Sequence, residues 1–235
     1  MKKKSAINSF FYRFLVILLK SLVLILICAA LCACIGVSMD ISIRSDNTGT
    51  MALEYRVSKM LANLGKLDGN ERWYTIPVGR ADFQRSMARL PGLRLSSFSS
   101  TDSSVDNITR AEIKFDNCND LMDFLDSSQQ NSEKRALYSR DGNKNRMFLV
   151  IMDKDFSINT DLLSLTETVF NGYTLNFSLS VPGNANLALT DASSIRYNTI
   201  PETIKLVPSG KKVSVKMDMI SLFDFPEGLG LEFTW

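Results

Sequence analysis

The sequence contains no histidine, and this absence removes several common kinds of chemistry. Histidine is the usual general base near neutral pH and the commonest zinc ligand. A serine–histidine or cysteine–histidine nucleophile is therefore excluded. The chain also lacks a Walker-type phosphate loop, a G-x-S-x-G elbow and a G-x-G-x-x-G turn. We therefore expect no catalytic residues, no metal site, no cofactor and no enzymatic activity.

Cysteine is scarce beyond the first part of the chain. Of the four cysteines, Cys28, Cys32 and Cys34 lie close together near the start, and Cys118 lies far from them. If Cys34 is modified, no disulfide can form within the domain that follows it. Cys118 has no cationic neighbour in the sequence to activate its thiol, so we expect it to be a small, partly buried apolar residue.

The first 33 residues carry basic side chains and no acidic ones. The basic residues come first, an apolar run at 21–31 follows them, and small residues around Cys34 end the segment, which is the layout of an export signal. Leu31, Cys32 and Ala33 resemble the three residues that precede the invariant cysteine of the lipobox in bacterial lipoproteins. This resemblance implies cleavage between Ala33 and Cys34, and acylation of Cys34. The protein would then be anchored to a membrane through its acylated N-terminus.

An uncleaved membrane helix is the alternative interpretation of the same segment. Residues 14–37 are long enough to span a bilayer, with the basic end in the cytoplasm. Both interpretations place the remaining chain outside the cytoplasm, facing the periplasm or the cell exterior. In a Gram-negative cell, Ile35 in place of aspartate after the lipidated cysteine implies sorting to the outer membrane, by the same resemblance to lipoproteins.

The charge of the chain depends on whether its first part is removed. Residues 1–33 hold five of the 27 basic residues and none of the 25 acidic ones, so the remainder has 22 basic residues and a net charge of −3. No basic stripe with interleaved aromatic residues remains, which argues against a nucleic-acid partner. The remaining length suits one hydrophobic core. We therefore expect residues 34–235 to form a single extracytoplasmic domain.

Hydrophobic periodicity predicts a mixture of strands and short helices. Alternation predicts a hairpin of strands 37–43 and 51–57, and helical spacing predicts helices near 58–65, 80–90, 116–128 and 162–170. The segment 127–145 is polar and is predicted to be a connection. The last third is strand-rich, with predicted strands at 173–181, 203–207, 212–220 and 229–235. The pattern predicts the α+β class, with an antiparallel sheet and helices packed on one face.

Two groups of acidic residues invite a functional interpretation. Asp120, Asp123 and Asp126 share one face of a predicted helix, and Asp153 and Asp155 flank Lys154 at the end of a predicted strand. Carboxylates in such groups bind cations or transfer protons when other polar residues converge on them. No such residues converge in the sequence, so we interpret both groups as solvated surfaces.

Three segments resemble the LppM-type domain of bacterial lipoproteins. They are GVSMDISIRSDNTGTMALEYRV at 36–57, LNFSLSVPGNANLALTDAS at 175–193 and KKVSVKMDM at 211–219. The resemblance implies a helix-grip-like fold, in which a curved sheet wraps a helix and leaves a cavity suited to lipid or glycolipid. The helix at 162–170 would line that cavity through Leu162, Leu165 and Val169.

Aromatic residues near the end of the chain form a further candidate contact. Phe223 and Phe225 lie in an apolar stretch, where aromatic side chains can rim a pocket or touch membrane lipid. The sequence therefore predicts a membrane-anchored, non-enzymatic lipoprotein that binds lipid or glycolipid. The alternative is a structural lipoprotein that binds another protein of the cell envelope.

Overall fold

The computed structural model describes residues 36–58, 79–104, 106–126, 134–154 and 172–235. These residues belong to one compact unit, Ile35–Trp235. The described residues form two β-sheets, two short α-helices and one 3₁₀-helix. Strands dominate, so the α+β class holds in the coarse sense that both kinds of element occur.

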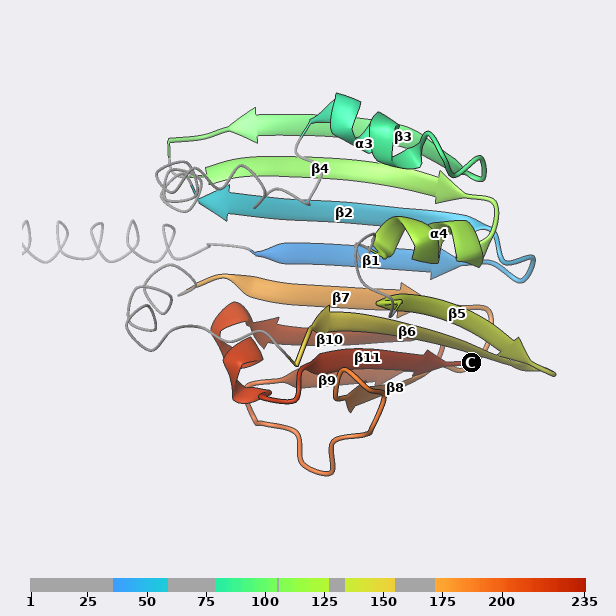
Figure 1. Cartoon of the computed structure of the whole chain (residues 1–235), viewed down its shortest axis with the longest axis vertical. Helices are drawn as coiled ribbons and strands as arrows, with labels where there is room; N and C mark the ends of the chain where they lie inside the picture. Colours follow the sequence, from blue (N-terminus) through green and yellow to red (C-terminus); the bar gives the residue numbers. More distant parts are fainter. Residues whose placement is uncertain (1–35, 59–78, 105, 127–133, 155–171) are drawn as a thin grey trace, which may run out of the picture. The chain divides into compact units, whose positions relative to one another are not determined.

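The larger sheet has seven strands in the order β3-β4-β2-β1-β7-β10-β9 (Figure 1). Its strands are β1 (Val37–Ile43), β2 (Gly49–Ser58), β3 (Leu93–Asp102), β4 (Asp106–Phe115), β7 (Thr174–Ser180), β9 (Lys205–Ser209) and β10 (Lys212–Asp218). Alternate residues of the central strands are buried, as the sequence predicted. In register, Ile41 of β1 lies between Met51 of β2 and Leu179 of β7, and all three side chains are fully buried.

The prediction of a wholly antiparallel sheet is wrong at the centre of this sheet, where β1 and β7 run parallel. Each strand pairs antiparallel with a different neighbour, β1 with β2 and β7 with β10. The sheet therefore joins two antiparallel groups side by side. A parallel pair needs a long connection, and all the elements between β1 and β7 supply it.

The smaller sheet has four strands in the order β5-β6-β11-β8. Its strands are β5 (Ala136–Asp141), β6 (Lys144–Met152), β8 (Asn186–Thr190) and β11 (Leu229–Thr234). The prediction of a single sheet is therefore wrong. The segment predicted as a polar connection contains β5, which pairs with β6 through a hairpin whose turn contains Gly142 at φ +57°.

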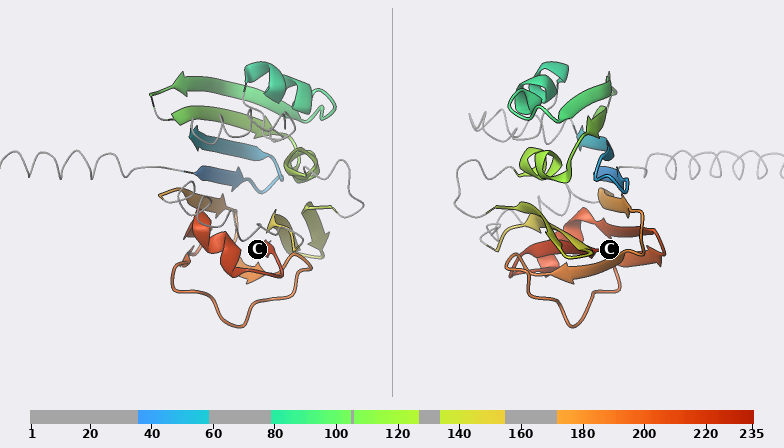
Figure 2. Two further views of the ribbon diagram at one scale, coloured as in Figure 1. Left: turned by 60° about the vertical axis from the view of Figure 1, so that its left-hand side comes forward. Right: turned by 90° about the vertical axis from the view of Figure 1, so that its right-hand side faces the viewer.

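The two sheets pack against each other through apolar side chains. The rings of Phe177 on β7 and Phe233 on β11 stack with their centroids 5.0 Å apart, and both rings are buried. Figures 1 and 2 show the smaller sheet lying against the part of the larger sheet that contains β7, β10 and β9. One hydrophobic core therefore connects both sheets.

The two described α-helices are short; the first lies beside β3, and the second lies beside β4 and also beside β5 of the smaller sheet. They are α3 (Arg80–Met87) and α4 (Cys118–Leu125). The ring of Phe83 on α3 lies edge-on to Phe98 of β3 at 5.7 Å and stacks with Phe124 of α4 at 6.3 Å. The predicted helices near 58–65 and 162–170 lie outside the described residues, apart from Ser58, which ends β2.

Candidate functional site

The structure describes two of the predicted contact residues. Phe223 lies in the 3₁₀-helix η2 (Met219–Asp224), and Phe225 follows directly after it. The predicted cleavage and lipidation residues and the predicted cavity helix, namely Ala33, Cys34, Leu162, Leu165 and Val169, lie outside the described part of the chain.

Gly36 marks the point at which the chain enters the folded domain. It is buried, and its carbonyl oxygen accepts a hydrogen bond from the backbone N–H of Arg56 at 3.0 Å. A Cβ atom on Gly36 would lie 2.6 Å from the carbonyl oxygen of Thr174 and 3.1 Å from Cγ of Met219. Because no ordinary side chain tolerates such an approach to backbone, glycine alone fits between β7 and η2 here. Cys34 lies only two positions before Gly36 in the sequence.

The predicted strand from 212 to 220 is shorter than expected, because β10 ends at Asp218 and the chain turns into η2. The backbone N–H of Met219 donates to the carbonyl oxygen of Tyr173 at 2.8 Å, which fixes the start of η2 beside β7. Within η2, Ser221 and Leu222 are buried. Met219, Ile220 and Phe223 are partly exposed.

The two predicted aromatic contact residues differ in their surroundings. Phe225 is only 3% exposed, and its ring lies edge-on to the ring of Tyr197 with centroids 5.0 Å apart. The hydroxyl of Tyr197 donates to the carbonyl oxygen of Gly228 at 2.6 Å. Tyr197 therefore holds the segment that follows η2 in place through both its ring and its hydroxyl. Phe225 thus belongs to the core, whereas Phe223 reaches the surface.

A buried carboxylate on the outer face of the smaller sheet binds two exposed arginines, and the sequence did not predict this ion cluster. Glu232 of β11 accepts hydrogen bonds from the guanidinium groups of Arg146 on β6 and Arg196 after β8, each at 3.0 Å. The Glu232 side chain is only 10% exposed. Its carboxylate therefore links the segment after β8, which carries Arg196, to the central strands of the smaller sheet.

The pKa of Glu232 results from two opposing effects. Burial raises the pKa of this carboxyl group, but the hydrogen bonds and positive charges of Arg146 and Arg196 lower it by more. The pKa of Glu232 is consequently below its ordinary value, and the group is charged near neutral pH. A charged residue within the apolar run LGLEF was the sequence signal for this cluster, but nothing in the sequence identified the two arginines.

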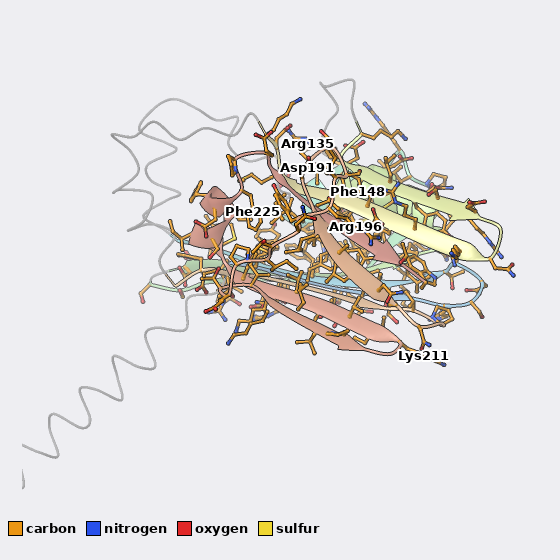
Figure 3. The ribbon with its side chains drawn as sticks, turned by 90° about the horizontal axis from the view of Figure 1, so that it is seen from below. Arg135, Phe148, Asp191, Arg196, Lys211 and Phe225 are labelled. Carbon is orange, nitrogen blue, oxygen red and sulfur yellow. The ribbon has the colours of Figure 1, made fainter. Side chains whose placement is uncertain are left out.

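An aromatic ring covers the backbone beside this cluster. The guanidinium carbon of Arg146 lies 5.8 Å from the centre of the Phe148 ring. A Cβ atom on Gly230 would lie 2.7 Å from the same ring, so the ring rests directly on the glycine backbone. In register, Phe148 lies opposite Glu232, the residue that binds Arg196; Phe148 and Arg196 are labelled in Figure 3. The cluster is a packed, ion-paired surface that stabilises the sheet.

The acidic residues considered in the sequence have separate partners. Asp120 accepts a hydrogen bond from the backbone N–H of Gly92 at 2.9 Å, and Asp123 pairs with Lys134 at 3.4 Å. Asp153 binds Arg135 at 2.6 Å, and Asp155 lies outside the described residues. Within the described ranges, no group of three or more acidic or cysteine side chains is close enough to hold a metal ion.

Cys118 is buried at the start of α4, and its thiol donates to the carbonyl oxygen of Asn47 with a distance of 3.6 Å. Burial raises the pKa of the Cys118 thiol to about 11. The thiol is therefore protonated near neutral pH, in agreement with the interpretation of Cys118 as a packed residue.

No helix among the described residues has the length and apolar character needed to cross a bilayer.

Comparisons with known proteins add a likeness in fold. No protein-family model matches the chain, and no curated protein sequence matches it. Among solved structures, the chain is similar to the NMR structure of the folded domain of LppM from Mycobacterium tuberculosis, with a TM-score of 0.39 and 12% sequence identity. The similarity covers 84% of this chain and 86% of that chain, and it is a likeness of fold alone.

Proposed function

We propose that the protein is a membrane-tethered lipoprotein whose extracytoplasmic domain binds lipid or glycolipid without catalytic turnover. Cys34 carries the acyl chains, and residues 1–33 are removed at export. The domain faces the periplasm or the cell exterior, and in a Gram-negative cell it is held at the outer membrane. The observation that carries this proposal is that the folded domain begins at Gly36, two positions after Cys34 in the sequence.

The start of the fold supports a tether without a linker. The sequence predicted that the first strand begins at Val37, and β1 begins there. Gly36 is already buried and hydrogen-bonded to β2 through Arg56. Two or three long acyl chains on Cys34 bind a bilayer firmly, because each buried methylene contributes about 0.8 kcal/mol. A domain attached this closely to the bilayer has direct access to membrane lipids.

The arrangement of polar groups supports a binding role in preference to catalysis. The chain has no histidine. The carboxylates of Glu54, Asp153 and Glu232 each accept hydrogen bonds from arginine side chains, which suits them to structural ion pairs.

One observation favours a protein partner as the second candidate function. Ile195 is 68% exposed on the connection between β8 and β9, and Val207 is 54% exposed on the edge strand β9. Exposed apolar side chains at or near an edge strand are typical of surfaces that bind other proteins. In this alternative the protein is a structural lipoprotein that holds an envelope protein at the membrane.

Mass spectrometry of the membrane-extracted protein tests the anchor. We expect an N-terminal Cys34 carrying diacylglycerol and, in many cells, a further acyl chain on its amino group. An intact Met1 would contradict the proposal.

Native mass spectrometry tests the ligand. Residues 35–235 form a compact unit, so a Cys34→Ser protein that begins at residue 34 is expected to fold without its anchor. After mixing with lipids extracted from the host, we expect it to retain one lipid class. Absence of lipid, together with an envelope protein that is captured by this variant and lost on Ile195→Asp substitution, would support the alternative.

A further inference from the structure

The 3₁₀-helix η2 lies directly beside the point where the chain enters the domain. The Cγ atom of Met219 would be 3.1 Å from a Cβ atom on Gly36. Gly36 lies against Thr174, the first residue of β7, and Met219 donates a hydrogen bond to Tyr173 directly before it. In register, the start of β1, the start of β7 and the end of β10 all lie at the same end of the larger sheet. We call this the Gly36 end, and η2 lies there at the left of Figure 1.

The side chains of η2 form an apolar face that is only partly buried in the domain. Side chains three residues apart eclipse each other in a 3₁₀-helix, so Ile220 and Phe223 share one face. Both are partly exposed, whereas Leu222 on another face is buried. The six residues of η2 contain one charged side chain, that of Asp224 at its end.

The length of the tether determines what lies opposite this face. Cys34 and Gly36 are two residues apart, which allows a separation of at most about 7 Å when the chain is extended. The glyceryl group on an acylated Cys34 lies at the level of the lipid headgroups, because its acyl chains are in the hydrocarbon. The Gly36 end therefore stays within about one headgroup layer of the bilayer surface.

Resting on the lipoprotein function proposed above, we propose that η2 is a bilayer-contact element, with Ile220 and Phe223 lying in the headgroup region of the membrane that holds Cys34. The contact orients the domain with its Gly36 end toward the bilayer. The turn between β9 and β10, which contains Lys211, then points away from the membrane, because β10 runs from that turn to η2. Figure 3 shows Lys211 and Phe225 far apart along the molecule.

Spin labels on the full lipidated protein test the proposal. Ile220→Cys and, as the matched control, Lys211→Cys are each labelled with a nitroxide in phosphatidylcholine vesicles. Buried Cys118 stays in place, and protein without an added cysteine shows whether it takes up label. Collision rates are measured with oxygen, which concentrates in the bilayer, and with a nickel chelate, which stays in water. We expect an oxygen-to-nickel ratio several-fold higher at position 220 than at position 211.

The two reagents distinguish the outcomes that would contradict the proposal. Frequent collisions with nickel at position 220 would show that η2 faces water, and the proposal would be wrong. Few collisions with either reagent would show that the protein itself covers position 220, and this result would also overturn it. Mass spectrometry of the same sample reports whether Cys34 is acylated. Loss of acylation therefore identifies a failure of the lipoprotein function, separately from a failure of the η2 contact.

Discussion

At the residue scale, the least expected feature is a carboxylate buried in an apolar strand and held by two arginines. Removing a charge from water is costly, and this cost is offset only when hydrogen bonds satisfy the group. Arg146 and Arg196 each donate to one oxygen of Glu232, so both carboxylate oxygens have a partner. The arginines remain partly exposed, which lowers their own desolvation cost.

Replacement of Glu232 by glutamine should destabilise the domain in a pH-dependent manner. Near neutral pH we expect a loss of about 1–3 kcal/mol in the free energy of unfolding, because two charge-assisted hydrogen bonds are weakened in a buried position. The folded-state pKa is lowered from 4.5, so the stabilisation is complete above that value and is lost as the pH falls through the lower pKa. Urea unfolding as a function of pH measures both effects.

A matched control for this prediction is Glu202→Gln, which changes the same chemical group at an exposed position. The control variant should unfold like the parent protein at every pH. If the two variants were equally stable near neutral pH, or if the loss in Glu232→Gln were as large at about pH 3 as at neutral pH, the ion pairs of Glu232 with Arg146 and Arg196 would not stabilise the fold.

Cys118 should resist alkylation in the folded protein. Its burial and its raised pKa of about 11 leave little reactive thiolate near neutral pH. We expect iodoacetamide to modify Cys118 only after unfolding in urea, with the modified fraction read by peptide mass spectrometry. Rapid modification without urea would mean that the start of α4 opens readily.

At the scale of elements, local sequence signals predicted the hairpin β1–β2 and the helices α3 and α4. The hairpin turn contains Asp46, whose carboxylate accepts hydrogen bonds from the backbone and hydroxyl of Thr48, and Asn47 with φ +63°. Aspartate and asparagine favour such turns because their short side chains bond nearby backbone groups. These features can be predicted because each depends on residues close together in the sequence.

The second sheet could not be predicted in this way. The strand β5 has one buried apolar residue, Ala136, and a mostly exposed pattern, so its sequence is similar to that of a polar loop. Its pairing with β6 provides the stabilisation, and β6 in turn pairs with β11 from the end of the chain. The parallel pairing of β1 with β7 likewise joins segments far apart in the sequence, so no local pattern predicts it.

In the candidate site, too, local sequence predicted some features, whereas others depend on contacts between distant segments. The sequence predicted an apolar stretch around Phe223 and Phe225, but not that Phe225 packs on Tyr197 in the core while Ile220 shares a face with Phe223. That distinction depends on the 3₁₀ geometry of η2, whose period differs from both helix and strand. The proximity of η2 to Gly36 also required the fold, because far-separated segments form this contact.

Loss of the cap of α4 should destabilise the domain modestly. The side-chain oxygen of Asn117 accepts a hydrogen bond from the backbone N–H of Asp120 at 2.8 Å. Asn117→Ala should therefore lower the free energy of unfolding by about 1 kcal/mol and lower Tm by roughly 2–4 °C. Thermal unfolding followed by circular dichroism measures this. Asn119→Ala, at an exposed position in the same helix, is the control, and an equal effect of both substitutions would contradict a capping role.

At the scale of the whole molecule, charge opposes the close approach that the tether imposes. The chain from Cys34 onward has a net charge of −3, and two exposed carboxylates lie at the ends of η2: Asp218 directly before it and Asp224 as its last residue. Anionic lipids repel carboxylates at their surface within about one Debye length, roughly 10 Å at 0.1 M salt. The proposed contact of η2 with the bilayer must therefore be apolar in origin.

The apolar origin of the contact predicts its dependence on lipid charge. In the lipidated protein labelled at Ile220→Cys, we expect a lower oxygen-to-nickel ratio in vesicles containing phosphatidylglycerol than in vesicles of phosphatidylcholine alone. Added salt should restore the ratio, because it screens the repulsion. The pair of substitutions Asp218→Asn and Asp224→Asn should restore it without salt, whereas Asp141→Asn at an exposed hairpin turn should not. A ratio that rises with anionic lipid would show attraction between this end of the domain and the membrane charge, and would contradict an apolar contact.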